Sequence, residues 1–337
     1  MNQPATEDES TVAGDSRTRE VVIVGGGLAG LSAAIYLGRA KRDTLVIDSG
    51  KSMARWEPDV QNYLGFPDGI SGEELLARGC AQARAHEVEF ATDEIVDARR
   101  AEDTFVLRSR ERAYRSRRVL IATGIFHVPP EINGVAECLG HSMFFCKDCD
   151  GYRVQDKAVV IYGWTNETVE YALAMLAYTP IVAIVTDGRE PRWDQTHHRW
   201  IQEYELPVFT STILEACHEG CAIRCLRLSN GDEVEVDALF TTRGDICYNE
   251  LARSLDAELD PDGQIRVNAN MATSVPGLYA AGCVTPANCQ MLISAGDGAV
   301  AAQAINRDLF EESLKTHHLR RLRRQQLATE ETIPTVR

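Results

Sequence analysis

Apolar and polar positions repeat along the chain in patterns that predict an α/β fold. Residues 20–48 begin with an apolar strand, pass through glycines into an Ala/Leu-rich helical stretch, and return to an apolar strand that ends at Asp48. Residues 157–187 follow the same plan, with a strand KAVVIYG, a helix expected at about 166–177 and a strand IVAIVTD. Each passage has the order of a βαβ unit, so two Rossmann-like domains with parallel sheets are expected.

The remaining segments indicate that the second domain is inserted into the first. Residues 92–121 alternate like short antiparallel strands, more strands are expected from 207 to 242 around the turn Ser229-Asn230-Gly231, and a final helix is expected near 295–312. We predict a disordered acidic lead-in (1–19), a first domain (20–128 with 254–312), an inserted domain (129–253) and a basic tail (313–337). Each domain is predicted to have three layers of the ββα kind.

The first turn has the spacing of a dinucleotide-binding fingerprint. Gly25, Gly27 and Gly30 stand between the strand and the helix, and Asp48 ends the next strand. Glycines in this pattern allow a tight turn, close approach of a pyrophosphate to the backbone, and close helix packing, while the acid accepts hydrogen bonds from a ribose. The sequence therefore predicts a bound dinucleotide here.

Charge and composition narrow the classes of partner. The 337 residues carry a formal net charge of -15, which disfavours general binding to nucleic acid or to a membrane surface. No apolar run approaches the ~18 residues of a membrane span, and the N-terminus lacks the pattern of a signal peptide, so we expect a cytoplasmic protein. Residues 99–118 hold eight arginines against three acids, as a solvated hairpin or as a docking patch for an acidic protein.

Cysteine spacing supplies the candidate chemistry. Cys146 and Cys149 form a Cys-x-x-Cys pair, which is typical of a reducible disulfide but also of half a zinc site. Only Cys138 and His141 stand near as further ligands, at irregular offsets, so we expect no metal. The ten cysteines are otherwise expected to be mostly buried. This includes the three that recur every four residues, Cys217, Cys221 and Cys225.

Several of these motifs, in this order, resemble the low-molecular-weight thioredoxin reductases and related flavoproteins over residues 20–312. The likeness rests on VVIVGGGLAGLSAAIYLGRA, NYLGFPDGISGEELL, IATG at 121–124, CKDCDGY at 146–152, TSVPGLYAAG and SAGDGAVAAQAI. The resemblance implies an FAD-dependent disulfide oxidoreductase that is a homodimer. Its first domain would bind FAD, and its inserted domain would bind NADPH and carry the dithiol.

Carried over by position, the resemblance implies a set of FAD-binding residues from four stretches of the chain. They are Gly25, Gly26, Gly27, Ala29 and Gly30 in the first turn, Asp48, Asn62, the strand end Ala122, Thr123 and Gly124, and Gly282, Cys283 and Gln290. Position 283 departs from the family, which usually has an aspartate that accepts from the ribityl chain. Because a cysteine is a poor acceptor, we expect FAD to be held less tightly.

The resemblance also assigns roles at the dithiol. Cys149 would receive the electron pair from the flavin, Cys146 would attack the substrate disulfide, and Asp150 would move the proton. The substrate would be a thioredoxin-like protein or a small disulfide or dithiol.

The second glycine turn departs from the family pattern. Residues 163–168 (GWTNET) keep only Gly163, and Glu167 adds negative charge beside the helix. NADPH use is therefore doubtful, and Asp187 would favour NADH over NADPH, if any nicotinamide binds. The alternatives are an oxygen-dependent dithiol oxidase, a ferredoxin-dependent or diflavin-linked reductase, and a flavin redox sensor without turnover.

Overall fold

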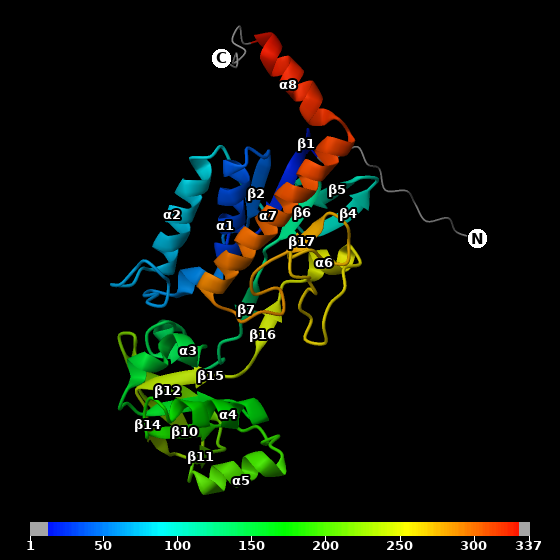
Figure 1. Cartoon of the computed structure of the whole chain (residues 1–337). Helices are drawn as coiled ribbons and strands as arrows, with labels where there is room; N and C mark the ends of the chain where they lie inside the picture. The colour runs from blue at the N-terminus through cyan, green and yellow to red at the C-terminus, as the bar shows by residue number, and fades with distance from the viewer. Residues whose placement is uncertain (1–12, 330–337) are drawn as a thin grey trace, which may run out of the picture. The chain divides into compact units, whose positions relative to one another are not determined.

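The computed structural model describes the backbone of residues 13–329, and in it the chain forms two compact units. Unit one comprises residues up to 52, 76–124 and from 247 onward, and unit two comprises 53–75 and 125–246. Residues 53–75 thus pack with the inserted part of the chain, whereas the sequence analysis assigned them to the first domain. Each unit is described by itself (Figure 1).

Unit one is built on a central sheet with both parallel and antiparallel strands. Its order is β3-β2-β1-β6-β5-β4, and β17 also pairs with β6. The parallel strands are β3 (Glu89–Thr92), β2 (Thr44–Asp48), β1 (Ala13–Val24), β6 (Arg112–Ile121) and β17 (Leu278–Ala280). Strands β5 (Thr104–Arg108) and β4 (Asp97–Ala101) continue antiparallel from the first half of β6, as expected from their alternation.

The start of β1 corrects one expectation. Residues 13–19 were assigned to the disordered lead-in, but they form the first part of β1, where Ala13 and Gly14 pair with Arg112 and Ala113. Strand β6 is ten residues long, so its first residues are available to pair with the start of β1. The rest of the expected lead-in, residues 1–12, and the end of the expected tail, residues 330–337, lie outside the described residues.

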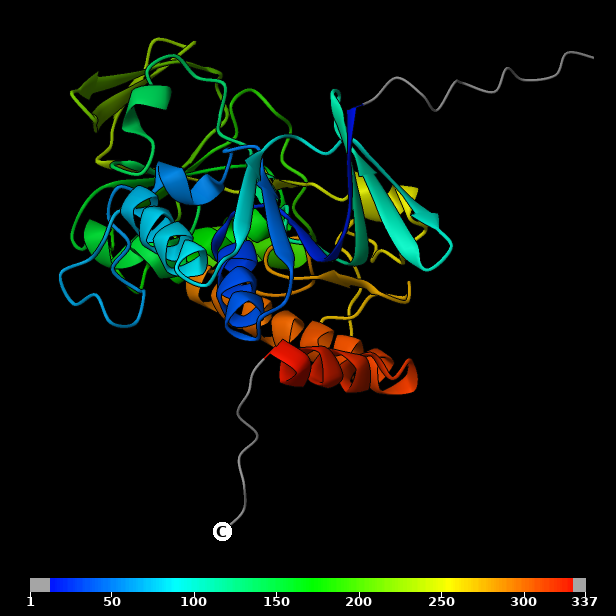
Figure 2. The same ribbon diagram turned by 90° about the horizontal axis from the view of Figure 1, so that it is seen from above.

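Alternation along β1 separates two hydrophobic cores. Val21 and Ile23 are fully buried with helices α1 (Leu28–Arg39) and α7 (Met291–Lys315) on one face of the sheet. Val22 and Val24 are buried on the other face with β4, β5 and helix α6 (Glu250–Ser254). Figures 1 and 2 show α1 and α7 side by side, and a Cβ on Gly298 of α7 would stand 2.0 Å from the Ala29 carbonyl oxygen. Only glycine permits this approach.

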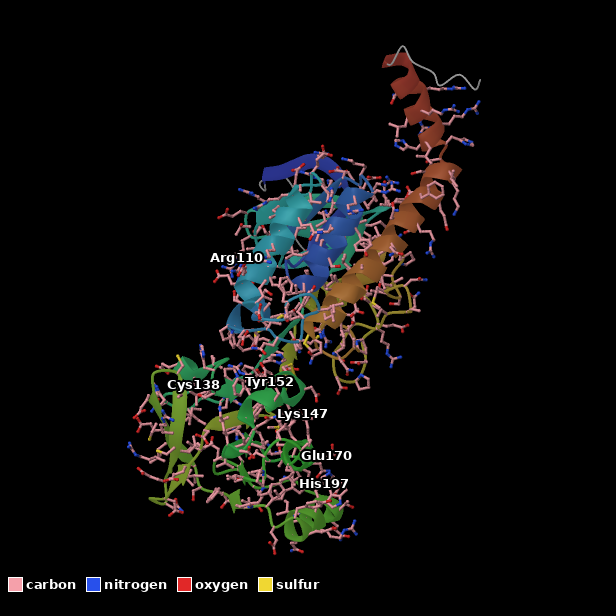
Figure 3. The ribbon with its side chains drawn as sticks, turned by 60° about the vertical axis from the view of Figure 1, so that its left-hand side comes forward. Arg110, Cys138, Lys147, Tyr152, Glu170 and His197 are labelled. Carbon is pink, nitrogen blue, oxygen red and sulfur yellow. A yellow bond between two sulfur atoms is a disulfide. The ribbon has the colours of Figure 1, made fainter. Side chains whose placement is uncertain are left out.

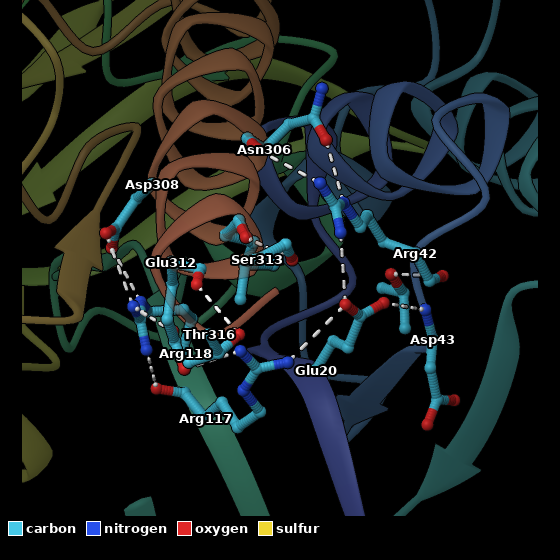
Figure 4. A network of polar contacts seen from close by, with 12 residues as sticks. Glu20, Arg42, Asp43, Arg117, Arg118, Asn306, Asp308, Glu312, Ser313 and Thr316 are labelled. Atoms are coloured by element: carbon cyan, nitrogen blue, oxygen red, sulfur yellow. Dashed lines mark hydrogen bonds and ion pairs between the residues drawn. The ribbon is translucent and has the colours of Figure 1, made fainter. Parts of the chain in front are cut away.

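Helix α7 is longer than the sequence analysis expected, and ion pairs fix its second half to the sheet (Figure 4). Arg118 of β6 donates from Nε to Asp308 (2.6 Å) and from Nη2 to Glu312 (2.7 Å). Arg42 donates from Nε to Oδ1 of Asn306 (2.8 Å) and from Nη1 to Glu20 of β1 (3.1 Å). The chain's last long helix is therefore an integral part of unit one.

Unit two repeats the three-layer plan. Its sheet has the order β11-β10-β9-β15-β8, and all of these strands are parallel. They are β11 (Val208–Phe209), β10 (Val182–Val185), β9 (Val159–Tyr162), β15 (Ala238–Thr241) and β8 (Met143–Phe144). Helix α4 (Asn166–Met175) packs on one face, and an antiparallel sheet of β12 (Ile213–Glu219), β13 (Ala222–Leu228) and β14 (Glu233–Glu235) packs on the other. The predicted fold class is confirmed.

Smaller elements complete both units. They are η1 (Met53–Trp56), α2 (Gly72–Arg84), β7 (Ile125–His127), η2 (Ala136–Cys138), α3 (Lys147–Asp150), η3 (Gly151–Val154), α5 (Gln195–Glu203), β16 (Asp245–Cys247) and α8 (His318–Thr329). Helix α5 was not predicted. Its N-cap is Asp194, whose Oδ1 accepts from the Thr196 and His197 amides.

Candidate active site

The first glycine turn, between β1 and α1, has room for nothing larger than glycine at two positions. A Cβ on Gly25 would stand 2.2 Å from the Ala122 carbonyl oxygen, and one on Gly30 would stand 1.9 Å from the Gly25 carbonyl oxygen. The Gly26 amide donates to Oδ1 of Asp48 at 3.0 Å, which ties the turn to the end of β2. The backbone of β1, α1 and β6 is therefore drawn close together around the start of α1.

The start of α1 is suited to an anionic ligand. Its N-cap is Gly27, which has no side chain to cap the helix, and its first turn contains no acidic residue. The first amides of a helix lack intrahelical partners and carry partial positive charge, so they attract a phosphate. The chemistry of this donor set fits a dinucleotide such as FAD, whose pyrophosphate would be held by Gly25, Gly26, Gly27 and Gly30 and whose ribose would be bound by Asp48.

The other expected FAD-binding residues of unit one cluster around the same turn. The Ala122 amide donates to the Val24 carbonyl oxygen (2.8 Å), and Thr123 Oγ1 donates to the Tyr248 carbonyl oxygen (2.7 Å). Gly124 has a φ of +68° and accepts from the Tyr248 amide. A Cβ on Gly282 would stand 3.0 Å from that of Ala29. Asn62 belongs to unit two.

Cys283 is not a free thiol. It forms a disulfide with Cys289, which lies just before the start of α7 at Met291. Cys283 was expected only to be a poor hydrogen-bond acceptor, and no role was predicted for Cys289. The spacing Cys283-x5-Cys289 was a signal in the sequence, but the two sulfurs meet because of how the loop between β17 and α7 folds.

The dithiol lies in unit two as a second disulfide. Cys146 and Cys149 are joined, with their Cα atoms 5.3 Å apart. Cys146 is the N-cap of α3, and its Sγ accepts from the Cys149 amide at 3.1 Å. Lys147 and Tyr152, labelled in Figure 3, belong to the short helices α3 and η3 that carry this pair. The donated N–H would stabilise a thiolate on Cys146 once the disulfide is reduced.

Two carboxyl groups with raised pKa values interact in the same unit as the dithiol. Asp150 is 5% exposed and pairs through Oδ1 with Nη1 of Arg153 at 3.0 Å. Burial raises the pKa of Asp150 despite this ion pair. Burial, and then the charge of Asp150, raise the pKa of Glu57 to about 7. Asp150 was predicted from the motif, whereas Glu57 was not, because it is 93 positions earlier in the chain.

Aromatic rings surround this segment. The ring of Phe145, next to Cys146, stacks on His127 with centroids 5.0 Å apart and lies 6.4 Å from the ring of Trp56. The Arg153 guanidinium lies 4.9 Å above the ring of Phe144. The short helix that carries the dithiol is therefore held by packing as well as by hydrogen bonds.

Comparison with known proteins assigns the chain to a family. Residues 19–305 match the model of the pyridine nucleotide-disulphide oxidoreductases. The chain belongs to this family. The family and enzyme class that the resemblance implied, the FAD-dependent disulfide oxidoreductases related to thioredoxin reductase, are confirmed.

Relatives match along most of their length. A thioredoxin reductase of Treponema pallidum is 31% identical over 294 residues, which cover 85% of this chain and 95% of the relative. One of Listeria innocua is 28% identical over 314 residues, covering 90% and 97%. Among solved structures, HlmI has a TM-score of 0.85 at 29% identity, covering 93% of this chain and 99% of the other. An oxidoreductase of Agrobacterium tumefaciens has a TM-score of 0.77 at 26% identity, covering 87% and 99%.

The second glycine turn of this family member is closed by its own side chains. Thr165 and Thr168 form a capping box at the start of α4, in which Thr168 Oγ1 accepts from the Thr165 amide at 3.2 Å. A Cβ on Gly163 would stand 2.2 Å from Oγ1 of Thr242 and 2.3 Å from Oγ1 of Thr168. Gly163 is thus required by packing within unit two. The first turn of α4 also contains Glu167, so this helix start lacks the features that suit α1 to a phosphate.

Residues just after β10 interact with other residues of unit two. Asp187 accepts from the Tyr162 hydroxyl (2.8 Å) through Oδ2 and from the Ile213 amide (2.7 Å) through Oδ1. The Arg189 guanidinium lies 4.2 Å above the Trp164 ring. Both carboxylate oxygens that were expected to favour NADH already accept hydrogen bonds within the protein.

The expectation that the other cysteines are mostly buried is wrong. Of the six cysteines outside the two disulfides, only Cys138 is buried, and Cys221 is exposed in the turn between β12 and β13. Cys217 stands opposite Cys225 across these strands, and both are partly exposed.

In the part of the chain that the structure describes, no three His, Cys, Asp or Glu side chains are grouped as metal ligands would be. Between residues 13 and 329, no helix has both the length and the apolar character needed to cross a bilayer.

Proposed function

We propose that the protein exchanges two electrons between FAD and the Cys146–Cys149 pair, and between this pair and a disulfide or dithiol substrate. The observation that carries the proposal is the closed Cys-x-x-Cys pair, whose neighbours are a donating amide and acids with raised pKa values. When bound, FAD would supply the two-electron chemistry that links a hydride or oxygen to thiols. The expected FAD residues in unit one, together with Asn62, would hold it.

Each residue of the dithiol would have its own step in the exchange with the substrate disulfide. A Cys146 thiolate would attack one sulfur of the substrate disulfide, form a mixed disulfide, and release the other sulfur as a thiolate. Cys149 would then attack Cys146 Sγ, close the pair again and release the second substrate sulfur. Asp150 and Glu57 hold protons to a higher pH than exposed carboxyl groups do. They are therefore suited to protonate the departing sulfur.

The relatives support a class of substrate. Several are thioredoxin reductases, which supports a thioredoxin-like protein as the partner, with a small disulfide as the alternative. We also propose the homodimer and the cytoplasmic location on the strength of the resemblance, and a division into two domains in which residues 53–75 join the inserted part.

Serine variants test the role of the dithiol. Cys149→Ser should abolish disulfide exchange and retain FAD, because the resolving sulfur is lost. Cys146→Ser should also stop exchange, but it should show a long-wavelength flavin–thiolate absorption band. Cys80→Ser, at a cysteine of unit one outside both disulfides, is the matched control and should leave exchange unchanged. Full activity in both dithiol variants would refute the proposal.

The glycine turn before α4 is closed by side chains, and this favours a second candidate function, that of an oxygen-dependent dithiol oxidase. The capping box of α4 and the engaged Asp187 carboxylate both weigh against a bound nicotinamide nucleotide. An anaerobic titration of the bound flavin with NADPH, NADH and reduced ferredoxin identifies the donor by bleaching. Bleaching by a dithiol instead, with oxygen consumed when air is admitted, would establish the oxidase. Redox-dependent partner binding without turnover would indicate a sensor.

A further inference from the structure

We propose that Cys283 and Cys289 form a second redox-active disulfide, which is opened by dithiols through attack on Cys289. The proposal goes beyond the proposed function, since it requires neither Cys146 nor Cys149. It rests on the position of the pair in the loop between β17 and α7 and on the groups that contact it.

The two sulfurs differ in their surroundings. Both cysteines are half-buried, but Cys283 stands between two buried residues, Gly282 and Val284. Cys289 follows the exposed Asn288, and Pro286 in the same loop is exposed as well. An incoming thiolate must approach along the axis of the S–S bond, so the sulfur on the exposed side of the loop is the one open to attack. Cys289 is therefore the attacked sulfur, and Cys283 is the leaving group.

The leaving sulfur has a stabilising neighbour. Cys283 Sγ lies 3.5 Å from Oγ of Ser294, a residue in the first turns of α7 that is 8% exposed. The hydroxyl can donate to a thiolate at this position. The start of the 25-residue helix α7 adds partial positive charge, and its first turn contains no acidic residue. A thiolate stabilised in this way leaves faster.

The loop can open without loss of its attachment to unit one. The Thr285 hydroxyl donates to the Gly282 carbonyl oxygen at 2.8 Å, and the Ile265 amide donates to the Val284 carbonyl oxygen at 2.8 Å. Gln264 Nε2 donates to the Thr285 carbonyl oxygen at 3.0 Å. These bonds hold residues 282–285 when the disulfide is broken, so reduction would release the exposed part of the loop alone.

The step balances with a dithiol as the reductant. One thiolate of the dithiol bonds to Cys289 Sγ as the S–S bond breaks, and the electron pair of that bond leaves on Cys283, which then takes up a proton. The second thiol of the reagent, as its thiolate, attacks the mixed disulfide and frees Cys289. The dithiol is oxidised to a disulfide, and two cysteine thiols are produced.

The test uses the full chain with Cys146→Ser and Cys149→Ser, so that only the second pair can react. The folded protein is incubated anaerobically with dithiothreitol, alkylated, and digested with trypsin. Residues 267–307 form one tryptic peptide that contains Cys283 and Cys289 and no other cysteine. We expect this peptide to gain two alkyl groups after reduction and none before it, with one equivalent of dithiothreitol oxidised per chain.

Two outcomes would overturn the proposal: alkylation of both cysteines without a reductant, or alkylation only after the chain has been unfolded with denaturant.

Ser294→Ala should slow reduction about five-fold, the effect of a lost hydrogen bond of ordinary strength. Ser313→Ala is the matched control, a buried serine of α7 whose hydroxyl donates to the Leu309 carbonyl oxygen, and it should not change the rate. Equal rates in the two variants would refute the role of Cys283 as the leaving group.

Discussion

Glu57 is the residue that most extends the chemistry expected at the dithiol. The motif contains one acid, Asp150, but folding places a second carboxyl group within its electrostatic range. Burial is the main cause that raises the pKa of Glu57, and the charge of Asp150 raises it further, to about 7. Burial also raises the pKa of Asp150. Glu57 can therefore supply or accept a proton near neutral pH.

Glu57→Gln should change the dependence of stability on pH. An acid whose pKa rises from 4.5 to about 7 on folding binds extra proton in the folded state between these values. The free energy of unfolding therefore falls as pH rises through this range, by up to about 3 kcal/mol. Urea unfolding at pH 5 and pH 8 should show this loss in the wild type and a smaller loss in the variant.

The control for this measurement is Glu73→Gln, since Glu73 lies in the same unit with its side chain 78% exposed. It should keep the wild-type loss of stability between the two pH values. If Glu57→Gln also keeps the whole of that loss, Glu57 does not titrate as the structure indicates.

At the scale of single residues, spacing alone predicted the redox pair. Cys-x-x-Cys places the two sulfurs within one turn of backbone, so local geometry is enough to bring them together. The Cys283–Cys289 pair and Glu57 could not be predicted in the same way. Their partners depend on how a loop folds back and on which segments pack together.

Among the elements, helices α1 and α4 hold equivalent places in the two units, but their N-termini differ. Both follow the first strand of a βαβ unit, yet α1 begins at a bare glycine and α4 begins at a threonine capping box. The sequence predicted the loss of glycines at residues 163–168. It did not predict that Thr168 and Thr242 would occupy the space beside Gly163 and satisfy the helix start themselves.

Gly30→Ala should strongly reduce the FAD that the purified protein retains. The added methyl would stand 1.9 Å from the Gly25 carbonyl oxygen, so the turn at the start of α1 must shift. Gly296→Ala is the matched control, because it is also a helical glycine and a Cβ there meets nothing within 4 Å. It should retain FAD and be more stable by up to about 1 kcal/mol.

Flavin absorbance per chain after dialysis measures the first effect, and circular dichroism shows whether the fold survives. Normal FAD content in Gly30→Ala would contradict the assignment of this turn to the cofactor.

For the whole molecule, unit one is assembled from three separate stretches of chain, and α7 is the last of them. Its attachment depends on a sheet residue, Arg118, whose side chain is 13% exposed and binds two acids of the helix. Arginine-rich residues 99–118 were interpreted as a solvated hairpin or a docking patch. At least Arg118 serves neither purpose, because its charge is used inside the unit.

Arg118→Met should lower the free energy of unfolding by about 2 kcal/mol, since it leaves Asp308 and Glu312 partly buried without their shared partner. Arg227→Met is the control. Arg227 also binds two acids, Glu215 and Glu233, but its side chain is 52% exposed. An exposed pair contributes little, so this variant should lose much less stability than Arg118→Met. Equal losses in urea unfolding would mean that the network around α7 is not a principal support.

Local patterns in the sequence were enough to predict the two βαβ units, the glycine fingerprint from Gly25 to Gly30 and the Cys-x-x-Cys pair, because each depends on periodicity or on short spacing. The residues that complete these sites are brought together only by the fold. Glu57 acquires its raised pKa from burial, Cys283 finds Cys289 through a loop, and the start of α4 is closed by a threonine from a distant strand end. Burial and contact between distant segments exist only once the chain has folded, so no local pattern could have predicted them.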